Sequence, residues 1–304
     1  MPLSLHIFIV IFVIGILLRA LAVLTKSHAD RLATFVFFVS LPATILVSLD
    51  RVSLAPTAWR LPLAACLITL PIVVCSWQLA RLLQLPRQTQ GGFVLAIGSI
   101  NSVYFAFPVI LATFGEEGLT HAVLFDLGQT TLTLTVLYGL AVRHGTQSAT
   151  PRSTAIRFLS SPPLWALSCI LIIKLSGHHL PPWLLELLKP LHFTTTPLAS
   201  LVLGLSISFS AIRRTARLAM LGAAVRMGGG LVLGLSAVWL LGLMGMERAV
   251  VILIAAMPSA VSSVIFAAET RLDEELVASI VALSICLAVV VLPWLPRLAA
   301  MLLH

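Results

Sequence analysis

The 304-residue sequence is 59% hydrophobic and only 10% charged, and its mean hydropathy is +1.08. Soluble domains contain roughly 25% charged residues, so this composition excludes an ordinary soluble domain and predicts a helical membrane protein with little mass outside the bilayer. The formal charge of +8 does not indicate nucleic-acid binding, because the basic residues fall in short segments between apolar runs, without interleaved aromatic residues.

Ten apolar runs follow one another along the chain, and each is predicted to cross the membrane as a helix. We expect these spans at residues 5–25, 32–49, 58–80, 92–114, 119–142, 162–177, 192–211, 219–244, 248–268 and 276–296. The longest polar segment predicts a cytoplasmic connector at 144–160, which separates one five-helix repeat at 1–143 from a second at 161–304. Residues 181–190 are predicted to form a short amphipathic segment before the seventh span.

The fourth run holds the only asparagine of the protein, Asn101, seven residues before Pro108. A proline inside a helix removes one backbone hydrogen bond and clashes with the preceding turn. In lipid, the freed polar groups must find another partner or line a cavity. The ninth run contains Pro258 in a similar setting. We therefore predict two membrane helices broken at prolines, a feature typical of transporter binding sites; two kinked helices packed on their neighbours are the alternative.

The two halves of the chain share landmarks at similar spacing. Pro42 in the second span corresponds to Pro197 in the seventh, and the acidic turn at Glu116 corresponds to the acidic loop at Glu274. Five spans per half would place the second half upside down in the membrane. The predicted fold class is therefore an all-α polytopic membrane protein with ten transmembrane helices in a 5+5 inverted repeat.

The loops between spans differ in positive charge. The odd-numbered loops hold most of the loop lysines and arginines, including Lys26, Arg81, Arg87 and Arg143. Because cytoplasmic loops are enriched in Lys and Arg, the odd-numbered loops are predicted to be cytoplasmic. Both termini are then expected on the extracytoplasmic side.

Several of these motifs resemble the auxin efflux carrier family, and the similarity extends over essentially the whole chain. The fourth and fifth spans carry it at Asn101 with Pro108, at 114–117 and at 123–127. The ninth span carries it at 257–263 and 267–269. Ser40-Leu41-Pro42 resembles the second span of the family, and Thr196-Pro197 with Val202-Leu203-Gly204 resembles the seventh. The short central connector is similar to that of the bacterial members. One departure is that Ser262 or Ser263 fills a position near the ninth-span proline that is often asparagine in the family.

The resemblance implies export or exchange of small organic anions, such as the dicarboxylates malonate and malate, across a bacterial inner (plasma) membrane. It also implies a fold like that of sodium–bile-acid symporters, in which helices 4 and 9 cross near the midplane at their broken points. Related carriers suggest a homodimer.

The ends of broken helices form an anion site without a buried cation, because a helix N-terminus carries roughly half a positive charge and free N–H groups. Neutral hydrogen bonds are expected from side chains beside the two breaks, namely Asn101, Ser102, Ser259, Ser262 and Ser263. Tyr104, Pro108 and Pro258 complete the predicted substrate site. The alternative for the serines is close helix packing, which small residues favour in membranes.

Two charged residues lie inside apolar runs. Asp126 is a candidate for proton coupling, since intramembrane carboxylates are often functional; alternatively it supports the fifth span through Gln129, one turn further on. Arg226 in the eighth span is expected to pair with an acid, approach a substrate anion or lie near the interface. The neighbouring glycines at 228–230 are expected to allow tight packing or bending.

The sequence contains no pattern typical of an enzyme: HExxH, GxSxG and paired aspartate motifs are absent, and no metal or organic cofactor is predicted. The four cysteines lie in apolar runs without CxxC spacing. The predicted function is therefore secondary active transport of a small carboxylate. The alternative is a sodium- or proton-coupled symporter of another substrate class on the same fold.

Overall fold

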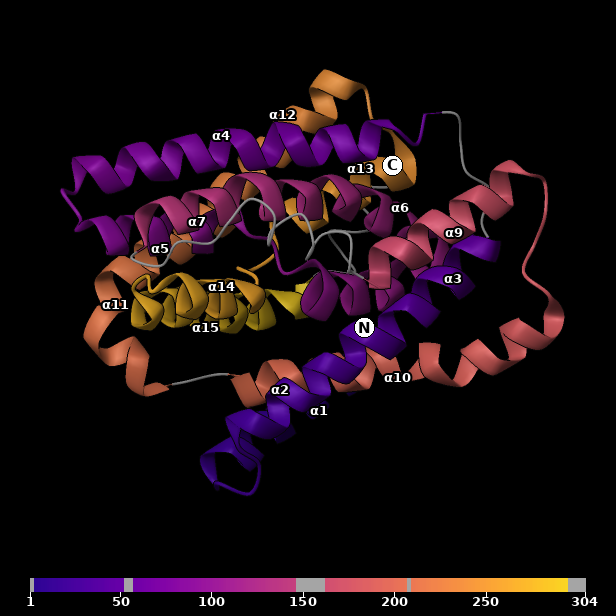
Figure 1. Ribbon diagram of the computed structural model, residues 1–304, viewed down its shortest axis with the longest axis horizontal. Coiled ribbons are helices and arrows are strands. Elements are labelled where there is room, and N and C mark those ends of the chain that lie inside the picture. Colours follow the sequence, from indigo (N-terminus) through magenta and orange to yellow (C-terminus); the bar gives the residue numbers. More distant parts are fainter. Residues whose placement is uncertain (1–2, 52–56, 146–161, 207–208, 295–304) are drawn as a thin grey trace. The chain divides into compact units, whose positions relative to one another are not determined.

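A computed structural model describes residues 3–51, 57–145, 162–206 and 209–294, and these residues are almost entirely helical (Figure 1). They contain no β-strand, only one isolated backbone bridge. The chain divides into two compact units. Unit 1 comprises residues 1–58, 103–123 and 157–206, and unit 2 comprises residues 59–102, 124–156 and 207–304. The predicted connector at 144–160 lies almost wholly outside the described residues.

Unit 1 contains helices of 10 to 25 residues. Its elements are α1 (Leu3–Ala20), α2 (Lys26–Phe35), the π-turn η1 (Val36–Ser40), α3 (Leu41–Arg51), α9 (Pro162–Leu175) and α10 (Pro182–Ser206). The helix α10 runs without interruption through Pro190 and Pro197. The prediction of a separate amphipathic segment at 181–190 is therefore wrong.

Unit 2 contains the remaining helices and most of the interrupted ones. Its elements are α4 (Arg60–Leu82), α5 (Arg87–Gly98), the π-turn η3 (Thr133–Leu137), α7 (Tyr138–His144), α11 (Phe209–Ala224), the π-turn η4 (Val225–Gly229), α12 (Gly230–Leu241), α13 (Gly245–Ala255), α14 (Ser262–Thr270), α15 (Glu274–Val291) and the 3-10 turn η5 (Leu292–Trp294). The predicted acidic loop begins α15, where the Asp273 carboxylate accepts a hydrogen bond from the Leu276 backbone N–H (3.1 Å) and caps the helix.

Two elements are divided between the units. The π-turn η2 (Ser102–Ala106) and the helix α6 (Phe107–Leu132) begin and end on different sides of that division. Within α6, Gly115 adopts a non-helical conformation with φ 69° and ψ −160°. A positive φ of this kind is readily available only to glycine. The tight turn predicted after the fourth span is therefore present at Gly115.

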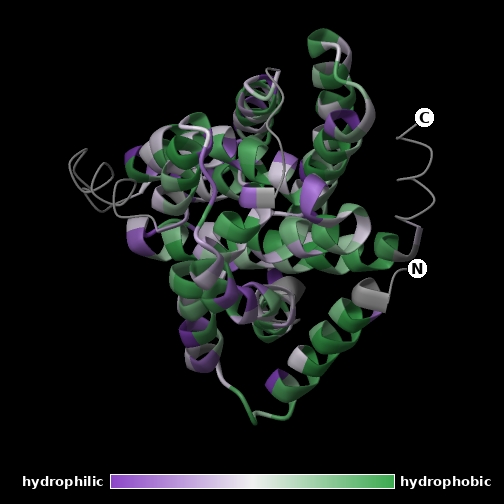
Figure 2. Cartoon of the chain, turned by 90° about the vertical axis from the view of Figure 1, so that its right-hand side faces the viewer, coloured by the Kyte–Doolittle hydropathy of each residue, from purple (hydrophilic) through white to green (hydrophobic). Residues whose placement is uncertain are grey.

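Five helical stretches of the described chain, one of them containing the turn at Gly115, are long and apolar enough to cross a membrane, and hydrophobic residues predominate along the chain in Figure 2. They are Ser27–Asp50, Arg60–Leu82, Ser102–His144, Arg214–Leu241 and Glu274–Val291. Shorter apolar helices lie at His6–Ala20 and Trp165–Leu175. This organisation confirms an all-helical, polytopic membrane protein.

Helices of unit 1 approach closely where their sequences supply small or hydroxyl-bearing residues. A Cβ atom at Gly204 of α10 would lie 2.2 Å from the Phe12 carbonyl oxygen of α1, so this contact requires glycine. Between α3 and α10, the Thr44 and Thr195 hydroxyls are 2.7 Å apart, and a second hydroxyl pair joins Ser40 to Thr194 at 2.8 Å. Small residues and interhelical hydroxyl bonds are the usual means of joining helices in lipid.

Candidate functional site

Two interrupted helices meet inside unit 2. The helix α5 ends at Gly98 and helical structure resumes at Ser102, while α13 ends at Ala255 and α14 begins at Ser262. The residues between these ends are not helical, and they form an isolated antiparallel bridge between Ile100 and Ser259. We refer to this arrangement, residues 99–101 with 256–261, as the crossover.

Backbone hydrogen bonds hold the two breaks together. The Asn101 N–H donates to the Pro258 carbonyl (2.9 Å), and the Ala260 N–H donates to the Ser99 carbonyl (3.1 Å). Each break thus supplies one donor and one acceptor to the other. Two N–H and two carbonyl groups released by the interruptions are satisfied in this way, as is required where no water is available.

The two breaks differ in their relation to proline. The second break lies at Pro258, as predicted. The first was predicted at Pro108, and this position is wrong: the non-helical residues are Ser99–Asn101, and Pro108 is the second residue of α6. The π-turn η2 lies directly before α6 and ends two residues before Pro108. A π-turn widens the helix locally, and this adjustment accommodates the proline ring without ending the helix.

Arg226 binds the carboxyl ends of both interrupted helices. Its side chain is fully buried, and its guanidinium donates to the Ile97 carbonyl at the end of α5 (3.0 Å) and to the Ala255 carbonyl at the end of α13 (2.7 Å). Each helix C-terminus carries roughly half a negative charge. One guanidinium therefore offsets the two helix ends together, while its buried Nε has no hydrogen-bond partner within the described residues.

Glycine next to Arg226 makes this contact sterically possible. A Cβ atom at Gly230 would lie 2.0 Å from the Ala255 carbonyl oxygen and 2.3 Å from Nη2 of Arg226. Gly229 has only ordinary contacts, the nearest at 3.7 Å. Of the predicted functions of the glycine run, tight packing is therefore found at Gly230, while the π-turn η4 supplies a local irregularity in the helix.

Gln129 satisfies a further carbonyl at the first break. Its buried amide nitrogen donates to the Gly98 carbonyl (3.2 Å), and its amide oxygen accepts a hydrogen bond from Thr69 of α4. The Ser99 hydroxyl turns back to the Leu95 carbonyl (2.8 Å). Gln129 thus supports the broken end of α5 instead of bonding to Asp126.

Two hydroxyl groups at the crossover retain unused hydrogen-bonding capacity. Within the described residues, the buried Oγ atoms of Ser102 and Ser259 have no partner of hydrogen-bond geometry. The Asn101 amide nitrogen is 3.4 Å from the Ser259 carbonyl oxygen, at the outer limit of such a bond. Buried polar groups of this kind usually have a partner, so the Ser259 hydroxyl is available to a bound molecule, while the Ser102 hydroxyl also lies near the Asp126 carboxylate.

The other predicted serines have different environments. The buried Ser263 hydroxyl donates to the Ala260 carbonyl (2.6 Å) and closes the first turn of α14. Ser262 is half-buried and begins that helix. Of the two, Ser262 therefore has the side chain that remains free for a ligand, while Ser263 stabilises the helix start.

The carboxylate of Asp126 lies close to one of the two unused hydroxyls. Its Oδ2 accepts a hydrogen bond from Thr130 (2.9 Å), and the Ser102 hydroxyl is close enough to interact with the carboxylate. An acid of unit 2 thus adjoins the start of η2. No three His, Cys, Asp or Glu side chains gather into a metal site anywhere in the described ranges.

Tyr104 and Pro108 belong to unit 1. The Tyr104 hydroxyl donates to the Ala33 carbonyl of α2 (3.1 Å). That bond occupies the hydroxyl within its own unit. The assignment of Tyr104 and Pro108 to a substrate site remains a prediction.

Comparison with known proteins agrees with a transport function. The sequence matches the family model described as membrane transport protein over residues 3–296. The chain belongs to this family. The resemblance to the auxin efflux carriers, which are members of the same family, is thereby confirmed. The interrupted helices are thus features of a membrane transporter.

Two archaeal relatives align with this transporter along nearly their entire length. A protein of Methanothermobacter thermautotrophicus described as an uncharacterized transporter is 31% identical over 292 residues, 94% of each chain. A second, from Methanocaldococcus jannaschii and also described as an uncharacterized transporter, is 26% identical over 278 residues, 89% of this chain and 90% of the relative. The shared length indicates a common architecture.

Arg226 is the site residue of this transporter whose role the sequence did not reveal. Sequence reasoning expected an acid, a substrate anion or the interface as its surroundings, and the structure gives two backbone carbonyls instead. Arg226 is a lone basic residue inside an apolar, glycine-rich run. A charged residue within a membrane span is costly and normally has a specific partner, so this position alone indicated a buried contact for Arg226.

Proposed function

We propose that this transporter moves small organic anions, such as mono- or dicarboxylates, by efflux or exchange, with alternating access around the crossover. The observation that carries this proposal is the combination of two broken helices, a free Ser259 hydroxyl beside that of Ser102, and a cation bound to the carboxyl ends of both helices. Neutral donors then remain for the substrate.

The electrostatics of the crossover favour a carboxylate. Helices begin at Ser102 and Ser262, and their first N–H groups carry partial positive charge. The carboxyl ends of α5 and α13, which would repel an anion, are covered by Arg226. A site made from partial charges and neutral hydrogen bonds binds a carboxylate without the tight ion pair that would slow its release.

The wider architecture belongs to the same proposal. We infer ten membrane spans in a 5+5 inverted repeat, with the crossover near the midplane of the cell membrane, the odd-numbered loops cytoplasmic and both termini outside. Five long apolar helices, the turn at Gly115 and the two interrupted helices support this arrangement. The carrier is proposed to work as a homodimer.

Flux measurements in liposomes test the proposal. Purified protein is reconstituted, and uptake of labelled mono- and dicarboxylates is measured with a pH gradient and an electrical potential applied separately. We expect saturable carboxylate flux that Asn101→Ala abolishes while the variant still purifies as folded protein. Gln88→Ala, which removes an exposed amide of α5, is the matched control and retains flux. Near-normal flux in Asn101→Ala overturns the site.

Cation coupling is the alternative, favoured by the position of Asp126 beside Ser102. If protons are carried on this carboxylate, Asp126→Asn abolishes the dependence of flux on the pH gradient while exchange without a gradient persists. An unchanged pH profile restricts Asp126 to a structural role. Dependence of wild-type flux on sodium, with no carboxylate transported, overturns the anion proposal in favour of a cation-coupled symporter of another substrate class.

A further inference from the structure

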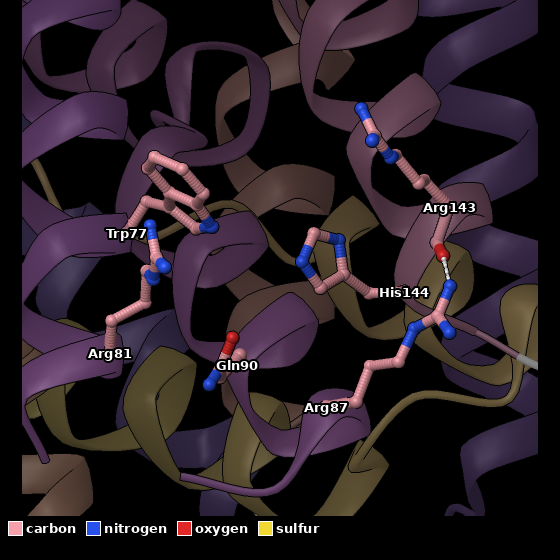
Figure 3. Close-up of a pocket in the computed structure, with 6 residues that line it drawn as sticks. All are labelled: Trp77, Arg81, Arg87, Gln90, Arg143 and His144. Carbon is pink, nitrogen blue, oxygen red and sulfur yellow. Dashed lines mark hydrogen bonds between the residues drawn. The ribbon is translucent and has the colours of Figure 1, made fainter. Parts of the chain in front are cut away.

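A basic cavity lies in unit 2 where three helices end or begin. It has a volume of about 370 Å³ and is lined by Trp77 and Arg81 of α4, Arg87 and Gln90 of α5, and Arg143 and His144 of α7 (Figure 3). Figure 3 shows Trp77, Arg81 and Gln90 on one side of the cavity and Arg143 and His144 on the other; Arg87 reaches the main chain of Arg143, whose side chain points away from Arg87. The cavity is separate from the crossover residues.

The residues that line the cavity include three arginines and no acidic residue. The ion pairs found across the described part of the chain join other residues: His179 to Asp50, Lys189 to Glu186 and Arg214 to Glu275. An anion bound among these arginines would offset their positive charge.

The three arginines keep donors available for such an anion. The Arg81 guanidinium lies over the Trp77 ring, 4.9 Å from its centroid, and this stacking leaves its N–H groups at the ring edge. Arg87 donates one N–H to the Arg143 carbonyl, and a guanidinium has five such donors. The fixed fork of arginine matches the oxygens of a phosphate.

An exposed apolar stripe of α4 leads to the cavity. Leu63, Leu70, Val74 and Trp77 are each between 38% and 50% exposed, and their spacing of three, four or seven residues places them on one face of the helix. In a membrane protein such a face contacts acyl chains. Tryptophan is enriched at the level of the lipid headgroups. The stripe therefore places the three arginines beside the headgroup region.

We propose that this cavity binds the phosphate of an anionic phospholipid, whose acyl chains lie along the α4 stripe. Arg81, Arg87 and Arg143 contact the phosphate oxygens, and Gln90 supplies a neutral hydrogen bond. Basic pockets between membrane helices are a known form of headgroup site. The bound lipid joins the ends of α4, α5 and α7, and α5 leads directly into the first break of the crossover.

Lipid binding to the intact protein tests this inference. Native mass spectrometry and thermal unfolding are measured in a neutral detergent with added phosphatidylglycerol, phosphatidylcholine or inorganic phosphate. We expect phosphatidylglycerol to bind and to raise the melting temperature of the wild type, and Arg81→Gln/Arg143→Gln to weaken that binding by roughly tenfold or more. Arg217→Gln, which removes an exposed arginine outside the cavity, leaves it unchanged.

The charge-preserving variant Arg81→Lys/Arg143→Lys is the control for a folding defect in the glutamine variant. It should retain part of the lipid binding, because lysine keeps the positive charge but lacks the planar, bidentate guanidinium. Equal lipid binding by wild type and Arg81→Gln/Arg143→Gln overturns the proposal. Stabilisation by inorganic phosphate without preference for phosphatidylglycerol also overturns it, since the cavity is then a site for a soluble anion. If Arg217→Gln loses as much phosphatidylglycerol binding as Arg81→Gln/Arg143→Gln, the binding depends on general surface charge and the proposed site is wrong.

Discussion

Polar groups are buried both between α3 and α10 of unit 1 and at the crossover of unit 2, but they are of different kinds. In unit 1 the groups are neutral hydroxyls that join two uninterrupted helices, Thr44 to Thr195 and Ser40 to Thr194. At the crossover they are mainly backbone atoms, and a cation holds two of them. An intact helix satisfies its own backbone and needs only weak bonds to a neighbour, whereas a broken helix requires strong donors.

Removal of the cation should have the largest effect. Arg226→Met leaves the Ile97 and Ala255 carbonyls buried without a donor, and at about 1–3 kcal/mol for each unsatisfied group we expect a loss of roughly 2–6 kcal/mol. The variant should yield little folded protein, measured by size-exclusion chromatography and thermal unfolding. Arg226→Lys, which keeps the charge, should recover part of the yield. Wild-type stability of Arg226→Met contradicts the assigned role.

Added bulk beside the same contact should have an intermediate effect. Gly230→Ala brings a Cβ to 2.0 Å from the Ala255 carbonyl oxygen, and overpacking of this kind costs about 1–3 kcal/mol. Gly229→Ala, one residue earlier, has its nearest contact at 3.7 Å and should melt close to the wild type. The comparison is made by thermal unfolding in one detergent. Equal melting temperatures for the two variants would show that α12 and α13 can shift apart to accept the added Cβ atom without loss of stability.

A glycine-to-alanine substitution in unit 1 tests whether the two regions differ in their effect on transport. Gly204→Ala places a Cβ 2.2 Å from the Phe12 carbonyl oxygen, so its stability loss should resemble that of Gly230→Ala. Flux per folded molecule should separate the two, because only Gly230 adjoins the arginine that holds the crossover. A larger loss of specific flux in Gly204→Ala would reverse this assignment.

The hydroxyl pairs of unit 1 should show the smallest effect. A double-mutant cycle with Thr44→Val and Thr195→Val should give a coupling energy of about 0.6 kcal/mol, the average for such bonds in membrane proteins. Thr131→Val, whose hydroxyl bonds only to the Leu127 carbonyl of its own helix, is the control. A coupling as large as the effect of Arg226→Met would remove the distinction between intact and broken helices.

Local sequence indicated one break accurately and the other only approximately. Pro258 lies in the second break, because a residue without an N–H cannot continue the backbone pattern. The first break contains no proline at Ser99–Asn101, and its position follows from pairing with a segment about 158 residues later. That pairing is tertiary, so the sequence around Asn101 indicates a polar position in lipid but not where the helix stops.

Long-range contacts also explain why the surroundings of Arg226 were not predicted. Its partner Ile97 is 129 residues away, and the bonded atoms are carbonyls, which carry no side-chain signature. The continuous course of α10 through Pro190 and Pro197 has a related cause, since packing against neighbouring helices tolerates a proline that local propensity disfavours. The apolar helices and the turn at Gly115 followed from composition and a single glycine.

The bridge between Ile100 and Ser259 has a consequence for how this family changes over evolutionary time. Its two hydrogen bonds join main chain to main chain, so an ordinary side-chain substitution deletes neither of them. Side chains beside the bridge, such as that of Asn101, are therefore free to vary while the frame that presents them persists. Under the proposed carboxylate transport, a change of substrate would then require new side chains beside the bridge and no change of the backbone.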